Sequence, residues 1–300
     1  MATYITIDGG TTNTRIGLIK DYNLIDIIKF DVGAGKGKEA LKDTIKNGIE
    51  ELLSRNNDVP ECILASGMIT SEYGLVNLPH ITVPAGIDEL HNSMEKVVLR
   101  EISSIPFCFI RGVKTECSNL EDADMMRGEE TEVVGILSGD GIYILPGSHS
   151  KIITIKDGKI LKFSTHLTGE MAKALSKNTI LKDAIVFCDE TDDEYLLNGF
   201  DCCSENGINE SLFKVRILKN IFKCNEKQIY SFFMGIILKD EIESIIKKKP
   251  VNVTIGGRKQ FKEAIAKILT KRTSINVNTI SEEAVEQSSF KGMVKIYEDR

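Results

Sequence analysis

Residues 3–20 read TYITIDGGTTNTRIGLIK. Two alternating apolar runs, at 4–7 and 16–19, flank a cluster of Asp, Gly and Thr, and this pattern predicts a β-hairpin. Glycine lets backbone amides approach a ligand closely, and amides together with threonine hydroxyls suit phosphate oxygens. Asp8 ends the first strand and is placed to hold Mg²⁺ through water, because Mg²⁺ prefers a carboxylate with retained waters. An ordinary glycine-rich turn is the alternative, but the order Asp-Gly-Gly-Thr-Thr-x-Thr-Arg favours phosphate binding.

The length and composition predict a two-domain globular protein. The chain has 300 residues, of which 42% are hydrophobic and 27% are charged. Its net charge of −6 argues against a nucleic-acid or anionic membrane partner. No apolar stretch approaches the roughly 20 residues that cross a bilayer, and the N-terminus has no signal-peptide pattern.

Cysteine usage points to a reducing compartment, so we expect a cytoplasmic protein. The chain has seven scattered cysteines and no Cys-x-x-Cys, which indicates neither a disulfide framework nor a zinc site. They are Cys62, Cys108, Cys117, Cys188, Cys202, Cys203 and Cys224.

The first half continues as a mixed α/β pattern. A third strand is expected at 23–32 and a helix at 38–54; the loop between them is not a P-loop, because Glu39 follows Lys38. A buried strand at 61–66 then opens into a loop of small and polar residues at 67–74. Ligands of α/β sheets bind at the carboxyl ends of strands, so this loop is a candidate substrate site, with a plain connection as the alternative. The candidate residues are Ser66, Gly67, Met68 and Ser71.

A second informative stretch, residues 122–137, reads DADMMRGEETEVVGIL and predicts a polar loop that leads into a helix. Carboxylates in a first helical turn can simply complement the helix dipole. The grouping of Arg127, Glu129 and Glu130 close to Asp124 also suits an acid/base site or a site for a substrate carboxylate.

Residues 141–155, GIYILPGSHSKIITI, repeat the strand–turn–strand design and predict a second phosphate turn facing the first, at Gly147 and Ser148. His149 could contact a phosphate or the substrate, or could be a structural hydrogen-bonding residue. A strand at 251–255 is followed by Gly256-Gly257 at a helix start, which suits the adenosine or α-phosphate of a nucleotide as well as an ordinary strand-to-helix turn.

The remaining C-terminal patterns are mostly helical. Helices are expected at 212–222, 226–248 and 282–297, and a last strand is expected at 274–277. The acidic cluster at 189–194 is interpreted as a solvated loop.

Two phosphate turns, one in each half, and a late Gly-Gly turn resemble the superfamily of sugar kinases, heat-shock ATPases and actin. Five motifs are similar, more narrowly, to those of the 2-dehydro-3-deoxygalactonokinase family and occur in the same order. They are DGGTTNTR (8–15), SGMITS (66–71), MRGEET (126–131), LPGSHSK (145–151) and LTGE (167–170). Segments 211–216 and 254–258 extend the resemblance, and MRGEET is its most specific part. The chain departs from the family at Gly9, where Trp is frequent, and at Ser148 and Ser150, where Thr and Cys occur in some members.

The resemblance implies an α/β fold of two ribonuclease H-like (actin-like ATPase) domains around an ATP cleft, at 1–115 and 116–300. The first would carry phosphate turn 1 and the substrate loop; the second would carry the catalytic carboxylate, phosphate turn 2 and the adenosine site. The implied activity is ATP-dependent phosphorylation of 2-dehydro-3-deoxy-D-galactonate to its 6-phosphate, within galactonate breakdown. A kinase of another sugar, and a non-catalytic nucleotide sensor or actin-like polymer, are the alternatives. A homo-oligomer stays open.

The expected roles divide the candidate residues into four groups. The catalytic base is Glu129, with Glu130 and then Asp124 as alternatives, and Asp8 binds hydrated Mg²⁺. The nucleotide contacts are Gly9, Gly10, Thr11, Thr12, Asn13, Arg15, Gly147, Ser148, Gly256 and Gly257. Arg127 binds the carboxylate of the sugar acid, because a bidentate guanidinium suits that group, and His149 contacts the substrate.

Overall fold

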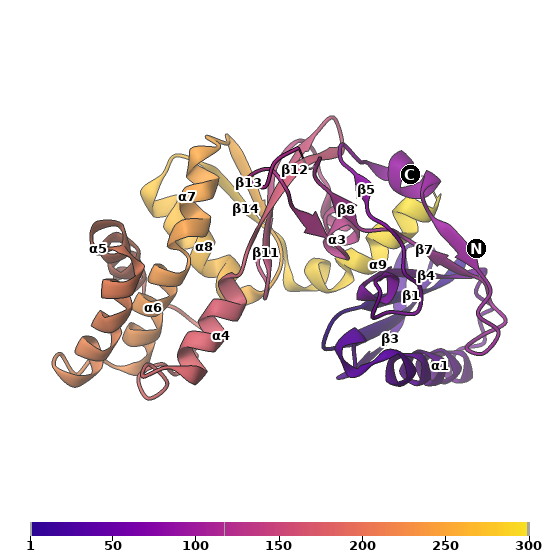
Figure 1. Cartoon of the computed structure of the whole chain (residues 1–300), viewed down its shortest axis with the longest axis horizontal. Coiled ribbons are helices and arrows are strands. Elements are labelled where there is room, and N and C mark those ends of the chain that lie inside the picture. Colours follow the sequence, from indigo (N-terminus) through magenta and orange to yellow (C-terminus); the bar gives the residue numbers. More distant parts are fainter. Residues whose placement is uncertain (1, 117, 299–300) are drawn as a thin grey trace. The chain divides into compact units, whose positions relative to one another are not determined.

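The computed structural model describes residues 2–116 and 118–298 (Figure 1), so Cys117 lies outside the described residues. Its strands are β1 (Thr3–Gly9), β2 (Thr14–Lys20), β3 (Asn23–Phe30), β4 (Cys62–Gly67), β5 (Ile81–Thr82), β6 (Glu95–Val97), β7 (Phe107–Phe109), β8 (Val113–Lys114), β9 (Met125–Met126), β10 (Gly141–Leu145), β11 (Ser150–Lys156), β12 (Lys159–His166), β13 (Asn252–Ile255) and β14 (Asn276–Thr279). Its helices are α1 (Lys38–Arg55), α2 (Ile87–Asn92), α3 (Glu129–Ile136), α4 (Thr168–Asn178), α5 (Asp193–Asn220), α6 (Glu226–Ile237), α7 (Lys239–Lys247), α8 (Lys259–Arg272) and α9 (Glu282–Glu298), with 3₁₀ helices η1 (Ala34–Lys36) and η2 (Met68–Thr70).

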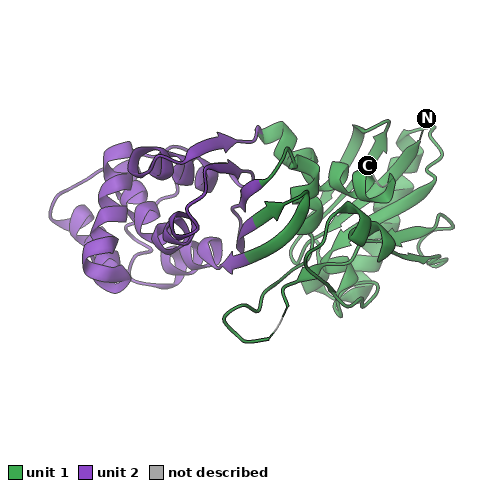
Figure 2. Cartoon of the chain, turned by 90° about the horizontal axis from the view of Figure 1, so that it is seen from above, with its two compact units in different colours: residues 1–140, 154–163, 282–300 green, residues 141–153, 164–281 purple. Residues whose placement is uncertain are grey.

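The chain forms two compact units, coloured separately in Figure 2. Unit 1 comprises residues 1–140, 154–163 and 282–300, and unit 2 comprises residues 141–153 and 164–281. Compactness therefore divides the chain elsewhere than between 115 and 116, because α3 and α9 pack with the first sheet. The domain boundary at 115/116 stays a prediction.

Unit 1 is built on a six-stranded sheet of order β3-β2-β1-β4-β7-β6. The predicted hairpin is confirmed: β1 and β2 are antiparallel, and β3 continues the meander. β4 runs parallel to β1, so both strands end at the same edge. The predicted helix at 38–54 is confirmed as α1, and its apolar residues are buried against the sheet (Figure 1). A small sheet, β5-β8-β9, follows in the same unit.

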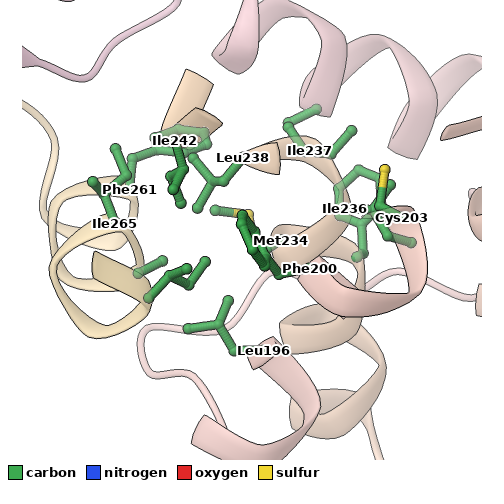
Figure 3. Close-up of a cluster of buried hydrophobic side chains, with 14 of the residues drawn as sticks. Leu196, Phe200, Cys203, Met234, Ile236, Ile237, Leu238, Ile242, Phe261 and Ile265 are labelled. Carbon is green, nitrogen blue, oxygen red and sulfur yellow. The ribbon is translucent and has the colours of Figure 1, made fainter. Parts of the chain in front are cut away.

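Unit 2 contains β10, β13 and β14, which are parallel neighbours in a sheet of order β12-β11-β10-β13-β14. Its helices α4 to α8 enclose the larger hydrophobic core, part of which Figure 3 shows. Phe200 of α5, Met234 of α6, Ile242 of α7 and Ile265 of α8 all contribute to this core. Four helices therefore share one core.

Three predicted boundaries in unit 2 are wrong. The helix expected at 212–222 exists as the second part of α5, but it starts soon after Gly207, whose backbone is non-helical (φ +73°, ψ 169°), and ends at Asn220. The first part of α5 begins at residue 193, because Asp192, within the expected solvated loop, caps it: Asp192 Oδ1 accepts a hydrogen bond from Tyr195 N at 3.0 Å. The helix expected at 226–248 breaks at Leu238 into α6 and α7, and the break lets both helices bury apolar residues in one core. The last strand lies at 276–279, where it pairs in register with β13.

Six cysteines are free thiols in the part of the chain that the structure describes. Within residues 2–116 and 118–298, no helix combines the length and the apolar character that spanning a bilayer requires.

Candidate active site

The turn between β1 and β2 forms the centre of the candidate site in unit 1. Gly10 N donates a hydrogen bond to Asn13 O at 2.9 Å, which closes the turn, and Thr11, Thr12 and Asn13 are exposed. Gly9 is buried beneath it: a Cβ at this position would lie 2.9 Å from Ile69 Cβ, so there is no room for a large side chain. The turn therefore presents its polar groups outward over a packed base.

Residues 33–36 support this turn from behind. Ala34 N donates to Gly10 O at 3.0 Å, and Gly35 N donates to Thr11 O at 2.8 Å. A Cβ at Gly33 would lie 2.5 Å from Gly10 O, so only glycine allows this approach. The carbonyls of Gly10 and Thr11 accept hydrogen bonds from this segment. The hydroxyls and the remaining amides of the turn itself are therefore available for an anion. The sequence predicts this segment only as a loop into α1; its two glycines, Gly33 and Gly35, were the available signal.

Asp8 lies at the end of β1 and is paired with Arg15. Arg15 Nε donates to Asp8 Oδ2 at 3.0 Å, and Arg15 Nη2 donates to the same oxygen. Arg15 also rests on α9, where Nη1 donates to Glu286 O at 3.3 Å and the guanidinium carbon lies 5.2 Å from the ring centre of Phe290. Both hydrogen bonds from Arg15 fall on Oδ2, so neither of them uses Oδ1.

Three stacked glycines, Gly9, Gly67 and Gly128, bring the motif MRGEET to the edge of the sheet where β1 and β4 end. Gly67 has φ +87°, and a Cβ there would lie 2.5 Å from Gly9 O; Gly128 has φ +113°, and its Cβ would lie 3.3 Å from Gly67 Cα. Ser66, the register partner of Asp8, has its buried hydroxyl 3.1 Å from Thr131 Oγ1 on α3. The start of α3 is therefore held beside the ends of β1 and β4.

The two glutamates predicted as bases have different surroundings. Glu130 is fully buried, and both of its oxygens accept from Gly128 N, at 2.9 and 2.8 Å. Burial, followed by the nearby charge of Glu129, raises the pKa of Glu130 to about 8. Glu129 is partly exposed, and its Oε2 accepts from Arg127 N at 3.1 Å. Glu130 thus shapes the loop, whereas Glu129 remains accessible at the first turn of α3.

Glu132 is a carboxylate of this site that sequence reasoning missed. It follows Glu129 by three residues, a spacing that puts two side chains on one helical face. Burial and the charge of Glu129 raise the pKa of Glu132 to about 7, Asp8 acts in the same direction, and Arg15 opposes the rise. The signal in the sequence was the three-residue spacing between Glu129 and Glu132. Asp8, Arg15, Glu129 and Glu132 form one charged group.

The guanidinium of Arg127 is hydrogen-bonded to the loop that follows β4. Its Nη1 donates to Thr70 O at 2.8 Å and to Thr70 Oγ1 at 2.6 Å, and its Nη2 donates to Leu78 O at 3.0 Å. Nη2 also lies 3.3 Å from His80 Nδ1. Burial and the charge of Arg127 lower the pKa of His80 to about 4, so His80 is neutral at pH 7. Arg127 therefore ties the loop to α3.

The remaining residues predicted for substrate in unit 1 are mostly covered. Ser66, Gly67 and Ser71 are buried, Met68 is partly exposed, and Ser71 Oγ donates to Met68 O at 2.7 Å. Asp124 lies before β9, where its Oδ1 accepts from Met125 N at 2.7 Å. The hydroxyls of Thr70 and Ser71 donate to carbonyls within the same loop, at Gly67 O and Met68 O.

In unit 2, the turn after β10 rests on the start of α4. Glu170 N donates to Ser148 O at 3.1 Å, and a Cβ at Gly169 would lie 2.2 Å from Gly147 O. His149 Nε2 lies 3.3 Å from Glu170 Oε1. His149 therefore has a structural partner on α4 as well as a place in the turn.

The Gly-Gly turn after β13 meets the same turn. Arg258 N donates to Pro146 O at 2.9 Å, and Arg258 Nη2 donates to Ser148 Oγ at 3.3 Å. Gly257 has φ +67°, and a Cβ there would lie 2.4 Å from Pro146 O, which explains the glycine. The structure thus brings together Gly147, Ser148, Gly256 and Gly257, which are distant in sequence.

Comparison with known proteins gives a consistent result. A sequence model of the family described as 2-keto-3-deoxy-galactonokinase matches residues 8–296. The 2-dehydro-3-deoxygalactonokinase of Escherichia coli (strain K12) is 24% identical over 255 residues, which cover 81% of this chain and 80% of that protein.

Solved structures show the fold. A candidate 2-dehydro-3-deoxygalactonokinase from Sinorhizobium meliloti matches 99% of this chain and 98% of its own, with a TM-score of 0.81 at 20% identity. The activator of 2-hydroxyisocaproyl-CoA dehydratase from Clostridium difficile, solved with bound ADPNP, matches 99% of this chain and 95% of its own, with a TM-score of 0.53 at 12% identity. The predicted α/β fold of two actin-like ATPase domains is confirmed.

Proposed function

The chain belongs to the 2-keto-3-deoxy-galactonokinase family, and we propose that it transfers the γ-phosphoryl group of ATP to the terminal hydroxyl of 2-dehydro-3-deoxy-D-galactonate. The product is the 6-phosphate. The observation that carries this proposal is the stack of Gly9, Gly67 and Gly128, which holds carboxylates of α3 beside a phosphate-type turn. Phosphoryl transfer needs this combination, because positioning and charge stabilisation supply most of its rate.

We assign the nucleotide to the two turns. In unit 1, the amides and hydroxyls of residues 9–13 would bind the β- and γ-phosphates, with Arg15 as a charged clamp. In unit 2, Gly147 and Ser148 would bind phosphate, and Gly256 and Gly257 would lie against the adenosine or the α-phosphate. Support comes from the outward-facing groups of the first turn and from the contacts that join the two segments of the second.

Asp8 is the residue we propose for Mg²⁺. Among the described residues, no three His, Cys, Asp or Glu side chains gather into a metal-binding group, so the ion would depend on Asp8, waters and phosphate oxygens. That ligand set fits magnesium, which keeps several waters. When bound, the ion neutralises charge on the phosphates. Arg15 keeps the Asp8 side chain oriented towards the turn.

Glu129 is the general base that we propose. A base must come within hydrogen-bond reach of the hydroxyl that it deprotonates, and Glu129 is accessible whereas Glu130 is buried on Gly128 N. Glu132 is the alternative in place of Glu130, because its pKa of about 7 matches a neutral working pH. Asp124 is less suited, since it lies before β9 and outside the first turn of α3, which carries Glu129.

For the sugar acid, we propose the loop at residues 66–71 and its surroundings. The guanidinium of Arg127 is engaged by Thr70 and Leu78, so we assign it to holding this loop as well as to attracting the substrate carboxylate. His149 remains a proposed substrate contact. We further propose a cytoplasmic enzyme whose partner is this small molecule; a homo-oligomer would be compatible with these roles.

The test is ADP release coupled to NADH oxidation, with ATP, Mg²⁺ and a panel of acceptors. The panel contains 2-dehydro-3-deoxygalactonate, its gluconate epimer, galactonate, galactose, glycerol and no acceptor. Turnover restricted to the keto-deoxy acids is expected. Equal turnover with neutral sugars would instead favour a kinase of another sugar on the same fold.

A further inference from the structure

A buried carboxylate lies next to the phosphate turn of unit 2 and has no part in the mechanism above. Glu241 is 1% exposed. Its Oε1 accepts from Ser150 Oγ at 2.5 Å, and its Oε2 accepts from Thr168 Oγ1 at 2.6 Å. Ser150 and Thr168 are buried as well. Burying a charge is costly unless it is hydrogen-bonded, so a carboxylate in this place needs an explanation.

The two hydroxyls belong to the two segments that carry the turn. Ser150 is the first residue of β11 and directly follows Gly147-Ser148-His149. Thr168 is the first residue of α4, the helix whose Glu170 N donates to Ser148 O. One carboxylate therefore joins the end of the turn to the helix on which the turn rests.

The helix that bears Glu241 is itself firmly anchored. Ile242 and Ile245 of α7 are fully buried in the core of unit 2. Figure 3 shows Ile242 among the core side chains near Leu238 and Phe261. Because α7 cannot shift without opening this core, Glu241 provides a fixed point for the turn.

The acceptor chemistry suits an ionised carboxylate. Such a group accepts at both oxygens and donates at neither, so it can take two hydroxyl hydrogens at once. A neutral amide has one accepting and one donating end, and would have to reverse one of the two contacts. Burial raises the pKa of Glu241, and the two hydroxyl hydrogen bonds oppose the rise.

We propose that Glu241 is a positioning residue that holds the turn Gly147–His149 in the shape that binds the phosphates of the nucleotide. The inference rests on the proposed function only in taking this turn as a nucleotide contact. Glu241 touches no reacting atom and acts through Ser150 and Thr168. Its loss should therefore weaken nucleotide binding and leave the chemical step and the binding of the sugar acid unchanged.

The experiment measures the Kd of ADPNP with Mg²⁺ by calorimetry for the full chain and three variants. Glu241→Gln should raise the Kd about tenfold, the scale of losing one hydrogen bond to a charged group. Thr168→Val should raise it about three- to tenfold, because it removes one donor at nearly constant volume. The matched control is Glu243→Gln, which changes a partly exposed glutamate two residues further along α7, paired with Lys239, and should leave the Kd unchanged.

Kinetics supply a readout that a merely structural role would not produce. In Glu241→Gln, KM for ATP should rise about tenfold, while kcat at saturating ATP and KM for the sugar acid stay within about twofold. An unchanged Kd in Glu241→Gln overturns the proposal, as does an equal rise of both KM values with a lower Tm. If Glu241→Gln does not fold, Thr168→Val decides in the same way.

The two proposals can fail separately. A wild-type chain that binds ADPNP but phosphorylates no sugar acid refutes the proposed function, and the Kd comparison still tests Glu241. A wild-type chain that phosphorylates the keto-deoxy acid, with identical Kd values in wild type and Glu241→Gln, refutes the role of Glu241 alone. Absence of ADPNP binding by the wild type overturns both.

Discussion

The two phosphate-type turns of this molecule are supported in different ways. The turn after β1 rests on backbone: the carbonyls of Gly10 and Thr11 accept amides from a neighbouring segment. The turn after β10 also depends on side chains, among them Thr168, Arg258 and the buried Glu241. A backbone support depends on the close approach that glycine allows at position 33, whereas a side-chain support can be removed one hydrogen-bonding group at a time.

The carboxylates beside the two turns also differ, in how far each is buried. Asp8 and Glu132 in unit 1 are partly exposed. Glu241 in unit 2 is buried and reaches only hydroxyls of its own unit. We therefore expect substitutions of the carboxylates in unit 1 to reduce the chemical step and substitution of Glu241 in unit 2 to reduce nucleotide affinity.

The largest expected effect is that of Glu129→Gln. Loss of a general base lowers rates by about 10²- to 10⁴-fold, so kcat should fall by that factor while the Kd of ADPNP changes little. Steady-state kinetics measures the fall in kcat, and calorimetry measures the Kd of ADPNP. Glu132→Gln is the comparison: a loss larger than that of Glu129→Gln would transfer the role of base to Glu132.

The next effect compares the strained glycines of the two units. Gly67→Ala and Gly257→Ala each force a positive φ on alanine and place its Cβ within 2.5 Å of a backbone oxygen. Each should lower the free energy of unfolding by about 2–4 kcal/mol, measured by urea denaturation. At permissive temperature, Gly67→Ala should lower kcat, whereas Gly257→Ala should raise KM for ATP.

Gly158→Ala is the control for this pair. Gly158 has φ +72° with no described atom within 4 Å of the added Cβ, so it has the same strain without the clash. It should cost about 1 kcal/mol and leave both kinetic constants unchanged. A cost equal to that of Gly67→Ala would mean that the close approach to Gly9 contributes nothing.

A smaller effect concerns Glu130 and pH. Its pKa is raised from the ordinary 4.5 to about 8, so between these values the unfolded chain loses a proton that the folded chain retains. The free energy of unfolding should therefore fall as pH rises from about 4.5 to 8 and then level off. Glu130→Gln removes this contribution and should reduce the fall between pH 5 and 8.5 by about 4 kcal/mol.

Glu241→Gln tests whether the buried carboxylate of unit 2 makes the free energy of unfolding depend on pH in the same direction as Glu130. Burial raises the pKa of Glu241 too, so its contribution has the same sign and the slope should again become shallower. A slope unchanged by either variant would show that the folded carboxyls titrate as in the unfolded chain. Denaturation at several pH values measures both.

The smallest effect is that of Arg258→Ala. The arginine is exposed and its contact with Ser148 Oγ is long, at 3.3 Å. We expect KM for ATP to rise about two- to threefold, with kcat unchanged, because an exposed polar contact is worth under about 1 kcal/mol. A tenfold change would mean that Arg258 contacts the nucleotide directly.

Much of this site was predictable, because its parts are local. The hairpin at residues 3–20 combines period-two apolar residues with a glycine-rich turn, and β1 and β2 pair as that pattern predicts. The start of α3 follows a glycine with φ +113° and carries its carboxylates in the first turn. Such features depend on neighbours within a few residues, so the sequence alone reports them.

Other parts depended on distant partners. The break at Leu238 carries no helix-breaking residue and follows from the shared core of α6 and α7. Arg127 was expected to bind a substrate carboxylate, but the carbonyls of Thr70 and Leu78 that engage it come from a loop about fifty residues earlier. Periodicity gives no information about such contacts.

By itself, the sequence determined the hairpin, the order of the motifs and the family, because turn chemistry, apolar period and motif order are properties of short segments. Only the tertiary structure decided which glutamate is buried, which is accessible, and that Glu241 meets Ser150 and Thr168, 91 and 73 residues away. The physical reason is desolvation: the chemistry of a carboxylate depends on the groups that replace its water, and packing alone selects those groups.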